Sequence, residues 1–298
     1  MGDLRIGMIG LDSSHAGAFA RLLNEPSNEY HVAGGKVVVA YAGGSDDFEF
    51  SHSRVEAFTR EMVGQFGVQL VDSPRAVAEV CDVVFITSVD GRVHLSQLKE
   101  ILPLKRPTFI DKPVATSLAD AGEIYRLAGN AGVPVVSSSA LRFTDAFVGA
   151  MKRGPATGGC DVFGPLPFEP TQYGWFWYGV HAIELVVAAM GVGCRNVACH
   201  ATESGDALSA VWADGRVATV HGLRRGHGQF GISIHREKEA QFVDVTAGPR
   251  PIYAGLLEAI MRTLPEGKVA VSPEETMEVV KILHVANRAR ETAERVAL

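Results

Sequence analysis

Two residues in this sequence have side chains suited to moving a proton, Lys112 and His181. Lys112 follows a short apolar run of strand character and precedes a proline, which favours an extended backbone for the lysine. Its amine would then project from the strand end, where it could hydrogen-bond a hydroxyl and stabilise negative charge on that oxygen. His181 stands in the first turn of an apolar helix, and an imidazole can accept a proton near neutral pH. The competing interpretations are a solvated lysine paired with Asp111 and a core histidine.

A third candidate is the turn Gly10-Leu11-Asp12-Ser13-Ser14-His15. A strand-like run precedes this turn and a helical pattern follows it, and the N-terminus of a helix offers free N–H groups to an anion. The two serines add hydroxyl donors, and the histidine could donate to a phosphate. A dinucleotide-binding turn reads G-x-G-x-x-G, however, and here Asp12 and His15 occupy the places of the second and third glycines. The alternatives are a modified anion site and a tight turn in which Asp12 or Ser13 caps the helix.

The elements that must position these residues alternate between strand and helix up to about residue 140. Strands are expected at Leu4–Ile9, Lys36–Ala42, Val68–Val71, Asp82–Thr87, Thr108–Ile110 and Val135–Ser138. Helices are expected between them, at Ala16–Leu23, Arg54–Gln65, from Pro74 onward, Val93–Leu102 and from Ser117 to Ala131. This alternation predicts an α/β fold, with a Rossmann-type, doubly wound parallel sheet over residues 1–140. Ligands of such sheets bind outside the carboxyl ends of the strands.

The pattern changes in residues 141–298. Proline and glycine become frequent between Gly154 and Tyr173, and the aromatic cluster Tyr173–Gly179 and a helix at Val180–Met190 follow. Strands without intervening helices are expected at Asn196–Thr202, Ala207–Ala213, Val217–Gly222, Gly231–His235 and Ala240–Val245, then helices at Ala254–Thr263 and Pro273–Val296. This order predicts an α+β domain with a mostly antiparallel open sheet. Its last helix could pack back on the first domain.

Composition excludes several classes of function. The 298 residues carry a net charge of −6 with no basic run, which gives no sign of a nucleic-acid surface. No apolar stretch approaches the roughly 20 residues that cross a bilayer, and no signal peptide is evident, so we expect a cytoplasmic protein without a membrane partner. The four cysteines, Cys81, Cys160, Cys194 and Cys199, form no CxxC pair, and we expect no metal site.

Three motifs together resemble the Gfo/Idh/MocA oxidoreductases, a family that includes glucose–fructose oxidoreductase and inositol 2-dehydrogenase. These motifs are Arg5–Leu11 (RIGMIGL), Asp111-Lys112-Pro113 and Tyr178–Glu184 (YGVHAIE). The resemblance implies an enzyme that binds NAD or NADP and transfers a hydride to or from a sugar, cyclitol or related polyol. It also implies that Lys112 and His181 are catalytic. A homo-oligomer, dimer or tetramer, built through the outer face of the second sheet is implied as well.

The resemblance and the strand ends together give a set of candidate binding residues. Cofactor contacts are expected from Gly10, Asp12, Ser13, Ser14, His15, Gly43, Gly44, Ser45, Ser88, Val89, Asp90, His94, Asp111 and Lys112. Substrate contacts are expected from Arg142, Trp175, Trp177, Tyr178 and Glu184. The serines 137–139 are expected to line the same side. The aromatic residues suit stacking on a sugar ring, and core or subunit interface is the competing interpretation.

Three departures from the family pattern leave other functions open. Asp12 would place a carboxylate beside a pyrophosphate unless it points away. No acid ends the second strand for the ribose, where Tyr41–Ser45 stands and Asp46 is the nearest acid. Trp177 replaces the aspartate that relatives often carry four residues before the catalytic histidine. The alternatives are a non-catalytic or regulatory relative that has lost dinucleotide binding, and a lyase or hydrolase that uses tightly bound NAD for transient oxidation.

Overall fold

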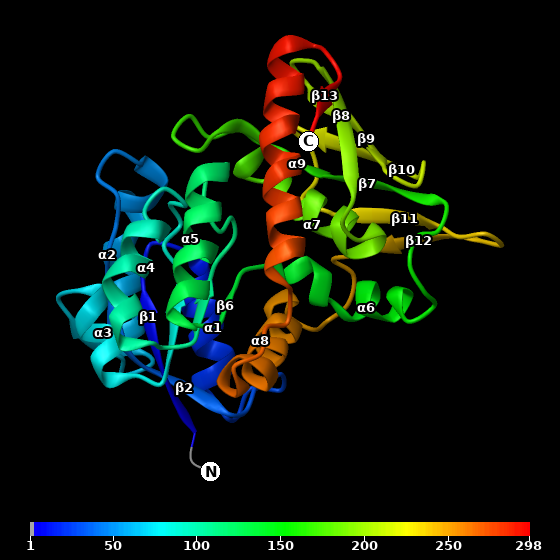
Figure 1. The fold of residues 1–298 in the computed structure, drawn as a ribbon. Coiled ribbons are helices and arrows are strands. Elements are labelled where there is room, and N and C mark those ends of the chain that lie inside the picture. The colour runs from blue at the N-terminus through cyan, green and yellow to red at the C-terminus, as the bar shows by residue number, and fades with distance from the viewer. Residues whose placement is uncertain (1–2) are drawn as a thin grey trace. The chain divides into compact units, whose positions relative to one another are not determined.

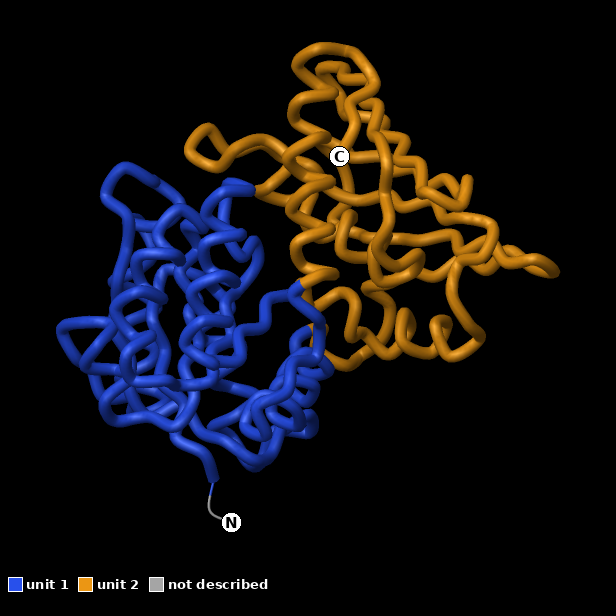
Figure 2. Tube along the Cα trace, viewed as in Figure 1, with its two compact units in different colours: residues 1–138, 253–273 blue, residues 139–252, 274–298 orange. Residues whose placement is uncertain are grey.

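The computed structural model describes residues 3–298, which divide into two compact units (Figures 1 and 2). The first unit contains the chain up to Ser138 together with Tyr253–Pro273. The second unit contains Ser139–Ile252 and Glu274–Leu298. None of the helices in the described part of the chain combines the length and the apolar character needed to cross a membrane.

The first unit is built on a six-stranded sheet in which all neighbouring strands run parallel, as the alternation predicted. Its strands are β1 (Leu4–Ile9), β2 (Gly35–Tyr41), β3 (Gln69–Val71), β4 (Val83–Ile86), β5 (Thr108–Ile110) and β6 (Val135–Val136). The strand order is β3-β2-β1-β4-β5-β6. The order reverses at β1, and the crevice outside the carboxyl ends of β1 and its neighbours is where such sheets bind ligands.

Helices cover this sheet on both faces (Figure 1), and the central strands β1, β4 and β5 are correspondingly mostly apolar and buried. The helices are α1 (Ser14–Asn24), α2 (Glu49–Gly64), α3 (Pro74–Val80), α4 (His94–Ile101) and α5 (Leu118–Ala131), joined from the far end of the chain by α8 (Ile252–Thr263). Phe19 of α1 packs against Phe85 of β4, Phe109 of β5 and Tyr253 of α8, with ring centroids 5.4–6.3 Å away. This aromatic core fixes the start of α1 over the middle of the sheet.

The second unit is built on a seven-stranded sheet of order β12-β11-β7-β10-β9-β8-β13. Its strands are β7 (Gly159–Pro165), β8 (Cys194–Ala201), β9 (Gly205–Trp212), β10 (Val217–Leu223), β11 (Gly231–His235), β12 (Ala240–Asp244) and β13 (Val296–Ala297). Only β7 and β10 pair in parallel, so the expected mostly antiparallel sheet is confirmed. Residues of β10 alternate between exposed and buried, as in a sheet with one covered and one open face.

Short and long helices complete the second unit: α6 (Asp145–Met151), α7 (Gly179–Met190) and α9 (Pro273–Thr292), with 3₁₀ turns at Ala140–Phe143 and Gly174–Phe176. The last helix was expected to continue to Val296, but it ends at Thr292, and Val296–Ala297 instead pairs with β8. Apart from Pro273, α9 groups with the second unit, whereas α8 groups mainly with the first.

The strand β7 was not expected, because its segment was interpreted as part of a proline- and glycine-rich connection. Gly164 explains why the pattern was misleading, since a Cβ there would lie 2.3 Å from the Phe230 ring. The glycine is needed for close packing inside a strand, although glycine usually signals a turn.

A buried ion-pair cluster fixes the segment between β7 and α7, which carries the aromatic residues. Asp206 is fully buried and accepts hydrogen bonds from Arg224 at 2.5 Å and from the indole N–H of Trp175 at 3.1 Å. Arg290 of α9 lies 3.2 Å from the same carboxylate, and both guanidinium groups lie over the ring of Phe168. One carboxylate therefore holds two cations and a tryptophan of the segment.

We expect Asp206→Ala to lower the free energy of unfolding by about 3–5 kcal/mol, because it leaves buried guanidinium groups unpaired. Urea denaturation followed by tryptophan fluorescence would measure the change. Glu203→Ala, which removes an exposed acid from the preceding loop, is the matched control. A loss below about 1 kcal/mol, the usual value of an exposed pair, would contradict this account of the cluster.

Candidate functional site

The turn after β1 lies against the ends of both neighbouring strands. The backbone N–H groups of Gly10 and Leu11 donate to the carbonyl oxygens of Tyr41 and Ala42, at 2.9 and 2.7 Å. Gly10 has a φ of +94°, and a Cβ at this position would lie 2.2 Å from Oγ of Ser88. Only glycine satisfies both constraints, which explains why the first glycine of the dinucleotide fingerprint is present at this position.

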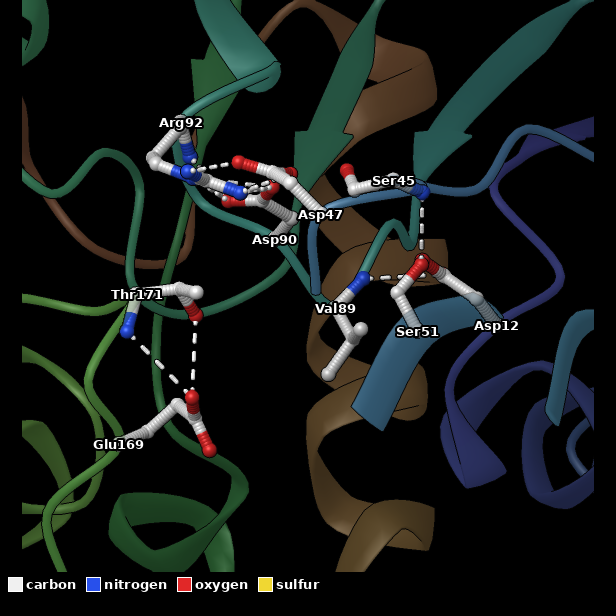
Figure 3. Close-up of polar contacts among 9 residues, drawn as sticks. All are labelled: Asp12, Ser45, Asp47, Ser51, Val89, Asp90, Arg92, Glu169 and Thr171. Atoms are coloured by element: carbon white, nitrogen blue, oxygen red, sulfur yellow. Dashed lines mark hydrogen bonds and ion pairs between the residues drawn. The ribbon is translucent and has the colours of Figure 1, made fainter. Parts of the chain in front are cut away.

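Asp12 points away from the start of α1 and into the protein (Figure 3). Its side chain is fully buried, and its two oxygens accept from the backbone N–H of Val89 at 2.9 Å and from the Ser51 hydroxyl at 2.6 Å. Ser51 Oγ in turn accepts from the N–H of Ser45 at 2.8 Å. Burial raises the pKa of Asp12, and the two hydrogen bonds oppose that rise. The carboxylate thus joins the loops after β2 and β4.

The helix α1 begins with a serine cap and a histidine that turns toward another strand. Ser13 is the N-cap, and its hydroxyl accepts from the N–H of His15, which settles the choice between Asp12 and Ser13. Nδ1 of His15 lies 2.5 Å from Oδ2 of Asp111, and the ring packs on Tyr253 at 4.8 Å. Ser14 is exposed. Because Nδ1 contacts Asp111, a contact of His15 with a phosphate would have to use Nε2, and that contact stays a prediction.

Asp111 is a buried carboxylate held in its charged form. Burial alone would raise its pKa, but the adjacent His15 ring and Lys112 outweigh burial and lower it to about 2. Its second oxygen accepts from the N–H of Lys112 at 2.9 Å, which fixes the backbone where the lysine emerges. Among the described residues, Nζ of the half-buried Lys112 makes no hydrogen bond. Its amine is therefore available to a ligand.

A second ion-pair group joins the loops after β2 and β4 (Figure 3). Arg92 donates to the buried Asp90, with a shortest distance of 2.7 Å, and forms two further bonds to Asp47 at 2.8 and 2.9 Å. The hydrogen bond from Arg92 lowers the pKa of Asp47. Asp46 was the acid expected at this strand end, whereas Asp47 makes the contact with Arg92, which lies 45 residues away in the sequence and is brought beside it only by the fold.

The other candidates of this edge serve the loops in different ways. His94 is buried, with Nδ1 near the carbonyls of Pro113 and Val114 and Nε2 2.9 Å from the carbonyl of Ser88. Gly43 and Gly44 have φ values of +67° and +111°, which expose their backbone at the end of β2. The structure brings the candidates of the first unit together at one edge of the sheet.

In the second unit, candidates cluster on α7 and on the turn Ala140–Phe143. Nδ1 of His181 lies 2.7 Å from the hydroxyl of Ser139, and Arg142 lies 3.5 Å from Glu184 and 2.9 Å from Glu275. The ring of Tyr178 packs edge-on against His181.

Trp175 and Trp177 are buried, with 0% and 7% exposure, which favours a core role over a ligand wall for these two rings. In the described part of the chain, no group of three or more His, Cys, Asp or Glu side chains could hold a metal ion.

Replacing Asp12 should weaken the fold, not simply clear the turn. We expect Asp12→Ala to lower the free energy of unfolding by about 1–3 kcal/mol, because the N–H of Val89 and the hydroxyl of Ser51 lose their acceptor. Chemical denaturation at pH 7 would measure it, with the exposed Asp46→Ala as control for the lost charge. Equal free energies of unfolding for Asp12→Ala and wild type would show that the carboxylate does not hold the loops after β2 and β4 together.

The pairing of Asp111 with His15 predicts a pH dependence. Because the pKa of Asp111 falls from 3.8 to about 2 on folding, its ionised form stabilises the fold above pH 3.8, and this stabilisation is lost as the pH falls toward 2. At pH 5.5 the free energy of unfolding of the wild type should exceed that of Asp111→Asn by about 1–3 kcal/mol. This difference should vanish below pH 2. Denaturation at several pH values tests this, with exposed Asp72→Asn as control. A pH-independent difference would be inconsistent with ionic pairing.

Comparison with known proteins agrees with the Rossmann-type fold of the first unit. Residues 4–139 match the family model for the Gfo/Idh/MocA oxidoreductases, described as an oxidoreductase family with an NAD-binding Rossmann fold. No curated protein matches the sequence.

Three solved structures share the fold over nearly their whole length. A probable dehydrogenase from Thermotoga maritima has a TM-score of 0.80 at 18% identity, with 99% of each chain covered. The apo scyllo-inositol dehydrogenase of Lactobacillus casei has a TM-score of 0.79 at 15% identity, covering 99% of this chain and 98% of that one. The myo-inositol dehydrogenase of Lactobacillus casei, solved with NAD(H) and myo-inositol, has a TM-score of 0.77 at 14% identity, covering 100% of this chain and 97% of that one. The match over residues 4–139 shows that this part of the chain is similar to the NAD-binding Rossmann domain of the Gfo/Idh/MocA oxidoreductase family.

Proposed function

We propose that this protein is an NAD-dependent dehydrogenase that transfers a hydride between the nicotinamide and a carbinol carbon of a sugar, cyclitol or related polyol. The orientation of Asp12 carries the proposal. Its carboxylate accepts hydrogen bonds from Ser51 and from the N–H of Val89, so it does not project from the start of α1 toward a bound anion. The departure that most threatened dinucleotide binding is thereby accommodated within the fold.

The residues at the carboxyl ends of β1 and β2 fit a dinucleotide. The backbone N–H groups of Asp12–Ser14, where α1 begins, would hold the pyrophosphate, with the exposed hydroxyl of Ser14 as an additional donor. The exposed backbone of Gly43 and Gly44 would lie beside the ribose. When bound, NAD⁺ would supply the hydride acceptor.

The charges near the end of β2 favour NAD over NADP. Asp46 and Asp47 are both exposed there, and carboxylates suit ribose hydroxyls. The two nearby guanidinium groups are engaged. Arg54 donates to the carbonyl of Asp12 and stacks on Phe50, and Arg92 is held by two aspartates. A 2′-phosphate would therefore meet negative charge.

The proton chemistry falls to residues of this chain. His181 would accept the proton of the substrate hydroxyl as the alcohol carbon is oxidised, and would return it in the reverse direction. Lys112, whose amine makes no internal hydrogen bond in the described residues, would stabilise the negative charge that develops on the same oxygen. Tyr178, Arg142 and Glu184 are the proposed substrate contacts, since they lie beside or one turn from the histidine.

The open face of the second sheet is proposed as the surface of a homo-oligomer. It exposes Val217, Thr219 and His221 of β10, and Phe242 of β12 is 61% exposed. A large exposed apolar side chain on an uncovered sheet face is typical of an interface between subunits.

A non-catalytic relative is the second candidate function. It is favoured by the contact of Nδ1 of His15 with Asp111, because that contact occupies one of the two ring nitrogens that could have donated to a phosphate. In that case the turn would keep its shape without a nucleotide.

Calorimetric titration with NAD⁺, NADH, NADP⁺ and NADPH tests the proposal, after denatured protein has been checked for trapped nucleotide. We expect binding of the NAD forms and weaker binding of the NADP forms. His181→Ala should keep the cofactor affinity, while turnover of a polyol substrate falls by about 10²–10⁴-fold. Exposed His52→Ala is the control. Absence of both binding and trapped nucleotide would favour the non-catalytic relative, and unchanged turnover would remove His181 from the reaction.

A further inference from the structure

At the position four residues before the histidine proposed as the base, the resemblance leads one to expect an acid. Trp177 stands there, and it is buried, with 7% of the residue exposed. An imidazole can act as a base only through the nitrogen that carries no proton, and the partner of the other nitrogen determines which one that is. A partner for Nδ1 of His181 must therefore come from elsewhere in the second unit.

That partner is Ser139, which is 42 residues away in the sequence and fully buried. Its Oγ lies 2.7 Å from Nδ1 of His181, and the same Oγ accepts from the backbone N–H of Leu141 at 3.2 Å. A second contact between the same two segments lies three residues further along each of them, where Arg142 is 3.5 Å from Glu184. Positions 139 and 142 thus face positions 181 and 184 in register, and the segment holds one turn of α7 at two points.

We propose that Ser139 is a positioning residue that fixes His181 in the tautomer with its proton on Nδ1, so that Nε2 is the proton acceptor. As a statement about catalysis, this rests on the proposed function of His181. A hydroxyl oxygen has two acceptor lone pairs. The N–H of Leu141 uses one of them. In the proposed tautomer, Nδ1–H of His181 donates to the other across the 2.7 Å contact.

The consequence for proton transfer follows from the ring. With Nδ1–H donated to Ser139, Nε2 bears the lone pair, so the substrate O–H bond can break toward it as the carbon loses its hydride. The product is an imidazolium whose Nδ1–H still donates to Ser139. If the hydroxyl donated to Nδ1 instead, Nε2 would already carry a proton and could not accept another.

The tautomer can be read directly, without substrate or cofactor. Protein containing ¹⁵N-labelled histidine would be studied by long-range ¹H–¹⁵N NMR at a pH where the ring is neutral, with His181→Gln used to assign its signals. We expect Nδ1 to appear protonated and Nε2 unprotonated in wild type. Ser139→Ala should shift His181 toward the Nε2–H tautomer that free imidazole side chains prefer, and Ser139→Thr should retain the wild-type pattern. An Nε2–H ring in wild type, or no change in Ser139→Ala, would overturn the proposal.

Kinetics then separate positioning from folding. Ser139→Ala should lower kcat by about 10–100-fold, the effect of losing a hydrogen bond to a group that becomes charged, while KM changes little. Ser139→Thr should restore most of the rate. Thr144→Ala is the matched control, because it removes a buried hydroxyl of the same segment that donates to the carbonyl of Leu141. Equal losses in Ser139→Ala and Thr144→Ala would indicate a merely structural role.

The two failures can be told apart. If wild type carries the Nδ1–H tautomer but His181→Ala leaves turnover unchanged, the proposed function of the histidine is wrong and the positioning by Ser139 stands as a structural fact. If His181→Ala abolishes turnover and the tautomer is Nε2–H, the base is correct and Ser139 is not its positioning residue.

Discussion

The first unit depends on one buried carboxylate, that of Asp12. An unpaired charge in a protein interior is costly, and a carboxylate there is tolerated only when hydrogen bonds satisfy it. Asp12 meets this condition with one backbone N–H from the loop after β4 and one hydroxyl from α2. Because the acceptor belongs to the turn after β1, three loops at the carboxyl edge of the sheet are held together. The raised pKa of Asp12 records the remaining cost of that burial.

This constraint explains why the turn departs from the glycine fingerprint without losing its shape. The second glycine of the usual motif lets the backbone approach a pyrophosphate. Here the side chain at that position is directed inward, so the outer side of the turn is formed by backbone and by Ser13 and Ser14. The retained Gly10 is explained differently, by its φ of +94° and by contact with Ser88. A comparison of residue types with the G-x-G-x-x-G motif would exclude this turn from anion binding, although the Asp12 carboxylate is directed away from the place where we propose that the anion binds.

The sequence predicted the architecture well because its signals are local. Alternating apolar runs and helical patterns identified both sheets, and Ser13 was correctly considered as an N-cap. The strand β7 was missed because Gly164 serves packing against Phe230, which no local pattern reveals. In the sites, the contacts between Asp12 and Ser51, Arg92 and Asp47, and Ser139 and His181 join residues 39, 45 and 42 positions apart. Such pairings depend on the fold and leave no periodic trace in the sequence.

The two histidines of the candidate sites have partners of opposite character. The partner of His15 is a carboxylate, and the His15 ring lowers the pKa of Asp111. Ser139, which contacts Nδ1 of His181, offers an uncharged hydroxyl. A base must exchange a proton on every turnover, whereas a structural ion pair must keep its charges. The contact with Asp111 therefore suits His15 to holding the start of α1 against the end of β5, and the contact with a hydroxyl is compatible with the proton transfer that we propose for His181.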